Sequence, residues 1–260
     1  MNKRRAAGLG IVAAVALVAL LSVVWTPYDP LHADPAARLQ GPGPAHWMGT
    51  DQFGRDLASR VMAGARVTLL VSLAAVALSA LVGVPAGVAA GMRRGAVEAL
   101  VMRLNDLALA FPALLLAIVF TAVFGASMWV AVLAVGLAGI PGFARVARVG
   151  TLQVMSQDYI LAARISGLPA PRIAAHHVLP NIAPLLSVQV SVALALAILA
   201  EAGLSFLGLG TPAPFASWGR MLQASQPYLA TAPHLALWPG AAIALTVFGF
   251  NLIGGRDDTR

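Results

Sequence analysis

Long stretches without a single charged side chain constrain this sequence more than any other feature. A helix that crosses the roughly 30 Å hydrocarbon core of a bilayer needs about 20 mostly apolar residues. Only 10% of all residues are charged, against about 25% in soluble proteins, so the chain has too little polar surface to cover itself in water. The windows without Asp, Glu, Lys or Arg are Gly8 to Trp25, Val67 to Met92, Leu107 to Ala144, Ile182 to Ala200 and Leu235 to Gly255.

The third of these windows predicts two helices rather than one. Leu107 to Ala144 is 38 residues long, and the turn-like segment Phe124 to Ser127 divides it. The fourth window extends past Glu201 toward Leu209. We therefore expect an all-α, polytopic membrane protein with six transmembrane helices. The expected division is 1–66, an anchor helix with an external loop, and 67–260, a five-helix core with a cytoplasmic loop at 150–181.

The positions of the basic side chains indicate which ends of these helices face the cytoplasm. Cytoplasmic loops of membrane proteins carry an excess of Lys and Arg. With the amino terminus inside, twelve of the 17 basic residues fall on the cytoplasmic side and five on the other, so we expect both termini in the cytoplasm. The twelve are Lys3, Arg4, Arg5, Arg93, Arg94, Arg103, Arg145, Arg148, Arg164, Arg172, Arg256 and Arg260, and the five are Arg38, Arg55, Arg60, Arg66 and Arg220.

The first window has two interpretations. A basic start followed by an apolar run is typical of a secretory signal peptide. Here the run is longer than usual, and Trp25, Thr26 and Pro27 follow it where small residues would precede a cleavage site. An uncleaved signal anchor is therefore the better interpretation.

A long external segment, Thr26 to Arg66, follows this first helix. From Asp56 onward, Leu57, Val61 and Val67 can share one apolar face. Such a pattern predicts a short helix lying on the membrane surface. A solvated loop held by local Asp–Arg pairs would have the same pattern.

A second long segment, Arg145 to Asn181, lies on the basic side. Asp158 can cap a short helix that Gly167 ends. Arg172 to Val178 predicts another short helix, which stops before Pro180. Such a projecting pair of helices could insert into a groove of another protein, although a re-entrant turn would have a similar composition.

Several function classes lack the residues that they require. The only lysine is Lys3, so the chain has no P-loop, whose lysine reaches the phosphates of ATP. It has no cysteine and no HExxH or GxSxG motif, and 17 Lys and Arg residues over 260 positions do not indicate a nucleic-acid-binding surface. His176 and His177 would point about 100° apart on a helix, which makes a poor metal pair. The external histidines, His32, His46 and His234, could serve as ligands, but their spacing does not demand a metal.

Two local patterns predict contacts within the helix bundle. Gly83, Gly87 and Gly91 recur every four residues, which lines one helix face with residues that permit close backbone approach. The high glycine content would produce such spacings by chance as well. Asp106 follows Arg103 by three residues, and the simplest expectation is an ion pair on one helix.

Glu201 is a carboxylate near the end of a predicted span. A charged group inside a bilayer is costly, so it normally has a structural partner or lines a pathway. A structural or interface role is favoured over direct contact with a substrate. A self-sufficient ion-coupled carrier would need several such groups as a relay, and Glu201 alone approaches that description.

A series of short motifs resembles one family of membrane proteins. Asp158 to Arg164 with Gly167, and His177 to Asn181, resemble the EAA loop of ABC importer permeases. The chain is more closely similar to the second, C-type subunit of the dipeptide, oligopeptide and nickel permeases. The other motifs, in order, are Gly49-Thr50-Asp51, Gly54-Arg55-Asp56, Ser59-Arg60, Gly64-Ala65-Arg66, Arg103-Leu104-Asn105-Asp106, Ala110-Phe111-Pro112, Ala200-Glu201-Ala202, Leu204 to Gly210, Ser217-Trp218-Gly219 and Phe250-Asn251-Leu252.

The resemblance implies the type I ABC importer permease fold and a role as the transmembrane permease of an ATP-driven importer. A second homologous permease subunit would complete the pathway, two ATP-binding subunits would supply ATP and Mg, and an external substrate-binding protein would deliver the substrate. This chain would bind no cofactor, would not be an enzyme, and would lie in the bacterial cytoplasmic (inner) membrane. Peptides are the expected substrates, with nickel or glutathione as alternatives.

The resemblance also implies roles for individual residues. Leu161 stands where the family usually has glutamate, and the chain ends at Arg260, earlier than the family's usual ending, so the resemblance does not extend to ATPase contacts made by that glutamate or by a longer tail. Coupling to the ATPases is implied for Asp158, Tyr159, Ala162, Ala163, Arg164, Gly167, Arg172 and Ile173, and a place at the pathway or subunit interface for Glu201, Ser205 and Asn251.

Overall fold

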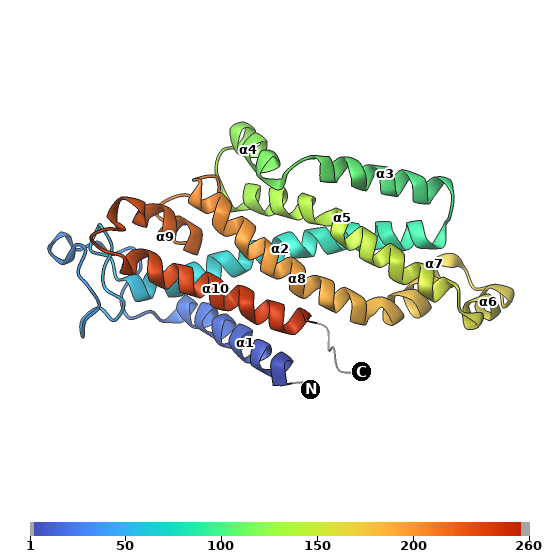
Figure 1. The fold of residues 1–260 in the computed structure, drawn as a ribbon, viewed down its shortest axis with the longest axis horizontal. Helices are drawn as coiled ribbons and strands as arrows, with labels where there is room; N and C mark the ends of the chain where they lie inside the picture. The colour runs from blue at the N-terminus through green and yellow to red at the C-terminus, as the bar shows by residue number, and fades with distance from the viewer. Residues whose placement is uncertain (1–2, 256–260) are drawn as a thin grey trace.

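The computed structural model describes residues 3–255, and in this range the chain consists of helices and irregular connections (Figure 1). The predicted tail beyond Gly255 lies outside the described residues. The helices are α1 (Lys3–Val24), α2 (Leu57–Met92), α3 (Ala96–Ala110), α4 (Ala113–Phe124), α5 (Met128–Met155), α6 (Asp158–Ile165), α7 (Ala170–Ile173), α8 (Leu179–Phe206), α9 (Trp218–Ser225) and α10 (His234–Gly254), with 3₁₀ turns at Pro35–Ala37 and Gln226–Tyr228.

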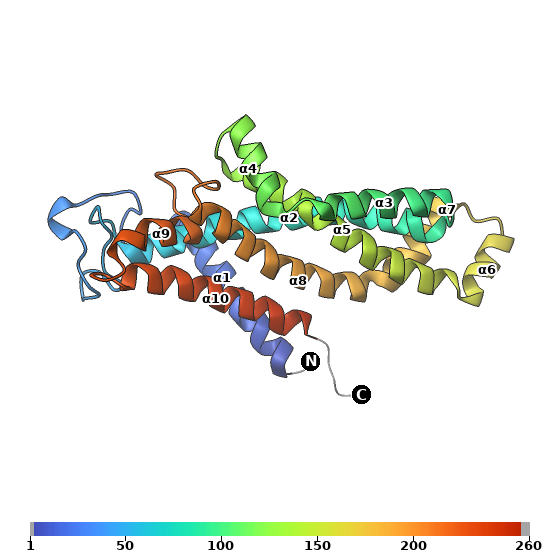
Figure 2. The ribbon, with the colours of Figure 1, turned by 45° about the horizontal axis from the view of Figure 1, so that its top comes forward.

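The long helices form one elongated bundle. Five helical segments are long and apolar enough to cross a membrane: α1, α2, α5, the segment that ends with α8, and α10. The pair α3 and α4 makes a sixth if it is counted as one bent span, which matches the predicted number. Figures 1 and 2 show α6 at one end of the bundle, here named the α6 end, and α9 with the loop of residues 25–56 at the other, here named the loop end.

The expected third span, Leu107 to Phe124, is broken in the structure. α3 ends at Ala110 and α4 begins at Ala113, with a bend of 79° between them. Pro112 has no N–H to donate and disfavours a helical conformation at Phe111, whose ψ of 116° is extended. The helix that was expected to begin at Leu107 instead begins near Gly95, directly after α2.

The prediction of a short surface helix beginning at Asp56 is wrong. The Asp56 carboxylate does cap a helix, because it accepts a hydrogen bond from the Ser59 N–H at 2.8 Å. The helix is α2, however, which runs without a break through Met92. Arg60, which lies outside the expected apolar face of Leu57, Val61 and Val67, is only 5% exposed and lies 3.4 Å from the Asp51 carboxylate.

The prediction of a separate short helix from Arg172 to Val178 is also wrong. α7 continues through a π-helical turn, Ala174–Val178, into α8, so that one helical segment runs from Ala170 to Phe206. Pro180, which has no N–H to donate, lies inside this continuous segment just after the π-helical turn, where the regular hydrogen-bond pattern is already interrupted. Asp158 is the first residue of α6, and Gln157 occupies the cap position.

The most extensive packing among the described helices is between α2 and α5. Gly83, Gly87 and Gly91 all face α5, and a Cβ atom at any of them would come within 2.6 Å or less of an α5 atom. The Ser79 hydroxyl, on the same side of α2, donates to the Gly136 carbonyl of α5 at 2.6 Å. The two backbones therefore touch over several turns, as the glycine spacing indicates.

Two ion pairs fasten α3 to α5. Asp106 bonds Arg145 at 2.6 Å, so the expected pairing with Arg103 is wrong. Glu98, in the first turn of α3, accepts hydrogen bonds from Arg148, one of them from Nε at 2.8 Å. The preferred partners lie on a neighbouring helix because α3 and α5 are in direct contact.

Candidate functional site

Helix α6 projects from the bundle and exposes most of its side chains (Figure 2). Its apolar side chains are unusually open to solvent, with Tyr159 44%, Leu161 59% and Ile165 79% exposed. Large apolar groups in this position leave a surface that a partner protein can cover. Asp158, Ala162, Arg164, Gly167 and Arg172, five of the residues implied to couple to ATPases, are also exposed.

The opposite face of α6 is buried against the bundle. Ile160 and Ala163 are 1% and 9% exposed, and they pack in one apolar cluster with Ile173 of α7. The same cluster contains Val88 of α2, Ala147 and Val154 of α5, and Ile182 of α8. Ala163 and Ile173 therefore belong to the apolar cluster that joins α6 to three long helices, and their side chains do not face outward.

Gly167 ends α6 in the way that the sequence predicts. Its φ of +75° is in the left-handed region, which glycine adopts at little cost. The Gly167 N–H donates to the Arg164 carbonyl at 3.0 Å, and the Leu168 N–H donates to the Ala163 carbonyl at 3.1 Å. These two bonds define a Schellman motif, which sets the direction in which the chain leaves α6 toward α7.

At the loop end, Glu201 lies inside the chain. Its side chain is fully buried, and its Oε1 atom accepts a hydrogen bond from the Ser205 hydroxyl at 2.7 Å. The hydroxyl groups of Thr68 on α2 and Ser217 before α9 also lie against this carboxyl group. Glu201 thus connects α8 to α2 and α9, and neither it nor Ser205 lies on a free surface.

Asn251 occupies the exposed side of α10. Its Nδ2 atom donates to the Val247 carbonyl at 3.0 Å, one turn earlier on the same helix. The structure therefore places Asn251 apart from Glu201 and Ser205, with a face of α10 open beside it.

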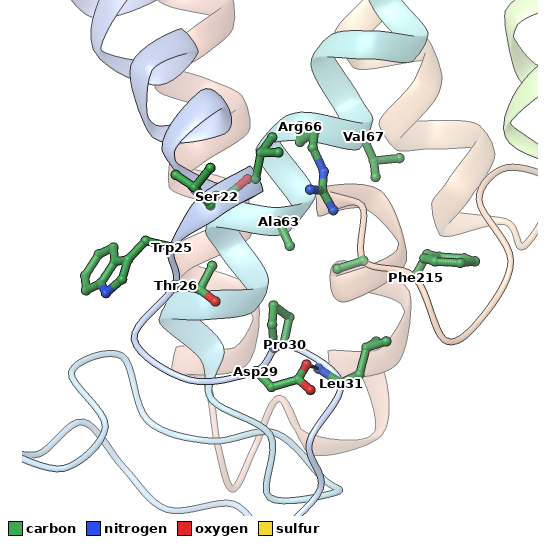
Figure 3. Close-up of a pocket in the computed structure, with 13 residues that line it drawn as sticks. Ser22, Trp25, Thr26, Asp29, Pro30, Leu31, Ala63, Arg66, Val67 and Phe215 are labelled. Carbon is green, nitrogen blue, oxygen red and sulfur yellow. Dashed lines mark hydrogen bonds between the residues drawn. The ribbon is translucent and has the colours of Figure 1, made fainter.

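The loop end also brings together residues that no motif in the sequence connects. Ser59, Ala63 and Arg66 fall at positions i, i+4 and i+7 of α2 and share one face. This spacing could have been read from the sequence once α2 was known to begin at Leu57. Ala63 and Arg66 line a pocket together with the loop around Asp29 (Figure 3), and the Ser59 hydroxyl accepts a hydrogen bond from the Tyr28 N–H of that loop.

Comparison with known proteins gives consistent results. Residues 83–256 match the family described as binding-protein-dependent transport system inner membrane component. The chain is 39% identical over 254 residues to a dipeptide transport system permease protein of Alkalihalophilus pseudofirmus, covering 97% of this chain and 83% of that protein. It is 36% identical to the nickel transport system permease protein of Escherichia coli (strain K12), covering 94% and 88% of the two chains.

A third relative is the glutathione transport system permease protein of Pectobacterium atrosepticum, which is 38% identical over 96% of this chain and 83% of its own length. The fold is similar to a chain of the inward-facing MetNI methionine ABC transporter, with a TM-score of 0.64. That similarity covers 75% of this chain and 93% of the other at 16% identity, so it concerns the fold alone.

The chain belongs to the family of binding-protein-dependent transport system inner membrane components. It is a multi-pass membrane protein and a permease subunit of an ABC importer, and the resemblance found in the sequence motifs is confirmed.

Proposed function

We propose that this chain forms half of the pathway of a peptide importer and that α6 is the coupling helix held by a separate ATPase subunit. The observation that carries the proposal is the two-sided character of α6. One side presents exposed Tyr159, Leu161 and Ile165, and the other side is locked to the bundle through Ile160 and Ala163.

The packing suggests how movement of α6 reaches the pathway. The cluster behind α6 includes side chains of α2, α5 and α8. Because α2 and α5 touch closely along several turns, they would shift together and would not deform one by one. A displacement of α6 by an ATPase would therefore tilt these helices as a unit, which is how packed bundles convert a local pull into a larger change.

The proposed orientation places the α6 end and both termini in the bacterial cytoplasm, and the loop end outside. Its support is the excess of Lys and Arg at the α6 end, where Arg93, Arg94, Arg164 and Arg172 lie. ATP and Mg would be bound by two ATPase subunits and not by this chain, which has no P-loop lysine and is not proposed to be an enzyme. A second homologous permease subunit and an external binding protein would complete the importer.

Peptides are proposed as the substrates because relatives named for dipeptides and for glutathione, a peptide, are 38–39% identical to this chain. The nickel permease relative at 36% identity supports the alternative that a metal chelate is carried. Competition for uptake between a labelled dipeptide, glutathione and a nickel chelate would separate these substrates.

Cross-linking tests the assignment of α6, because the chain has no cysteine of its own. We expect Ala162→Cys, on the exposed side, to cross-link to an ATPase subunit in the assembled importer. Ala163→Cys is the matched control, because Ala163 is the next residue along α6 but its side chain faces the bundle. Equal cross-linking of both variants, or of neither, would contradict the proposed role of α6.

A further inference from the structure

A pocket of about 400 Å³ opens at the loop end between α1, α2 and the connection that precedes α9 (Figure 3). Its size lies within the range of small-molecule sites, about 300 to 1,000 Å³. Apolar side chains form much of the wall, among them Leu31, Val67 and Phe215. Two charged side chains, Arg66 and Asp29, complete it.

Arg66 turns its guanidinium group toward the space above Ala63 (Figure 3). Among residues 3–255, no carboxylate lies within 4.0 Å of Arg66, although five other ion pairs form in the same range. Arg66 is exposed, and Ala63, one turn before it, is small enough to leave the pocket open. An arginine with its five donors uncommitted is well suited to a carboxylate or a phosphate.

Asp29 and Arg66 lie on opposite sides of Ala63 in Figure 3. Its Oδ1 atom accepts a hydrogen bond from the Leu31 N–H at 2.8 Å. Within the described chain, no Lys, Arg or His nitrogen lies within 4.0 Å of its carboxylate. Asp29 therefore keeps acceptor capacity for an ammonium group.

The segment that carries Asp29 is held in place against α2. The Tyr28 N–H donates to the Ser59 hydroxyl at 2.9 Å, and Arg60 Nη1 donates to the Pro30 carbonyl at 3.0 Å. Both anchors lie within two turns of Arg66 on α2. The two charges are thus carried by one connected piece of structure, which lowers the ordering cost of binding a ligand between them.

We propose that this pocket binds a zwitterionic ligand, with its carboxylate or phosphate on Arg66, its ammonium group on Asp29 and its apolar part against Phe215 and Leu31. A peptide with free termini and the headgroup of an ethanolamine phospholipid share this chemistry. The inference rests on the proposed orientation and peptide function, and it adds a second contact point for substrate outside the bundle.

The test uses the assembled importer in phosphatidylcholine nanodiscs with Leu31→Cys as a reporter in this cysteine-free chain. The measurement is the rate at which a maleimide labels this cysteine with and without dialanine. N-acetyl-dialanine amide, which has neither terminal charge, is the matched ligand control. Ala45→Cys, in the external loop but outside the pocket, is the matched protein control.

We expect dialanine to slow labelling at position 31 but not at position 45, and the capped analogue to leave both rates unchanged. Arg66→Gln or Asp29→Asn should raise the half-protecting concentration roughly tenfold or more, because each removes a charge-assisted hydrogen bond. Arg66→Lys should retain part of the protection, since it keeps the charge but loses the planar fork.

Nanodiscs that contain phosphatidylethanolamine distinguish a peptide ligand from a lipid headgroup. Slower labelling in these discs without any peptide, together with no effect of dialanine, would assign the pocket to the lipid headgroup. Equal protection by dialanine and its capped analogue would overturn the proposal. Absence of protection by dialanine, by the capped analogue and by phosphatidylethanolamine would overturn it as well. Peptide uptake by a complex that shows no protection would overturn this pocket alone and leave the proposed function intact.

Discussion

Replacing Gly87 with alanine tests the close packing of α2 against α5. A Cβ atom at Gly87 would lie 2.2 Å from the Ala144 carbonyl oxygen and 2.8 Å from the Ala147 Cβ atom. Ordinary non-bonded carbon–oxygen contacts are about 3.3 to 3.6 Å, so the two helices would have to separate locally by about 1 Å. The obstacle is backbone, which cannot rotate away as a long side chain can.

Gly10→Ala on α1 isolates the overpacking cost, because the added methyl group would meet no atom within 4 Å apart from its chain neighbours and the backbone of its own helix. Both variants gain about 1 kcal/mol of helix propensity, and only Gly87→Ala adds an overpacking cost of about 1 to 3 kcal/mol. At about 2 to 4 °C per kcal/mol for a chain of this size, the complex with Gly87→Ala should melt roughly 2 to 12 °C below the complex with Gly10→Ala. Melting temperatures of the two purified complexes, followed by tryptophan fluorescence, provide the measurement. Equal melting temperatures would refute the argument that α2 and α5 touch through backbone at Gly87.

Three further substitutions test other parts of the structure. Asp51→Ala should destabilise the loop end by about 3 to 5 kcal/mol, because it leaves Arg60 buried without its carboxylate partner. The rate at which a protease cleaves residues 25–56 measures this loss of stability, and a cleavage rate equal to that of the wild type would contradict the prediction. Gly167→Val forces a β-branched residue to a φ of +75°, at a cost of about 1 to 2 kcal/mol or more, and should lower peptide uptake while membrane insertion is unchanged. Gly41→Val, at an open loop position, is the control. Unchanged peptide uptake by Gly167→Val would exclude the assignment of α6 as the coupling helix. Glu201→Ala should loosen α9 and raise the labelling rate of the buried reporter Ser225→Cys, because it removes the side chain that lies against Ser217 at the start of α9. Glu201→Gln keeps an oxygen acceptor at the same place and should leave this rate unchanged; equal rates in the two variants would show that the side chain of residue 201 does not hold α9.

Local chemistry was predictable from the sequence where a single residue determines the conformation. Gly167 ends α6 because a left-handed residue is needed there, and the need is visible in the sequence alone. The apolar windows likewise predicted the long helices, since the length of a span follows from the thickness of a bilayer. The glycines of α2 indicated a close helix contact, though not that α5 was the partner.

Features that depend on distant residues were not predictable in the same way. Asp106 bonds Arg145, 39 positions away, because packing of α3 on α5 offers that partner. Arg60 is buried because the loop of residues 25–56 folds over the start of α2, which periodicity on one helix cannot show. The same holds for Glu201, whose neighbours Thr68 and Ser217 come from two other segments.

The most direct test of the central claim is dipeptide uptake into proteoliposomes. We expect ATP-dependent uptake only when this chain is reconstituted with a second permease subunit, the ATPase subunits and the binding protein, because its own sequence has no P-loop lysine. The chain alone should neither accumulate the dipeptide nor hydrolyse ATP. Concentrative uptake by liposomes that contain this chain alone would contradict its assignment as one coupled half of an importer.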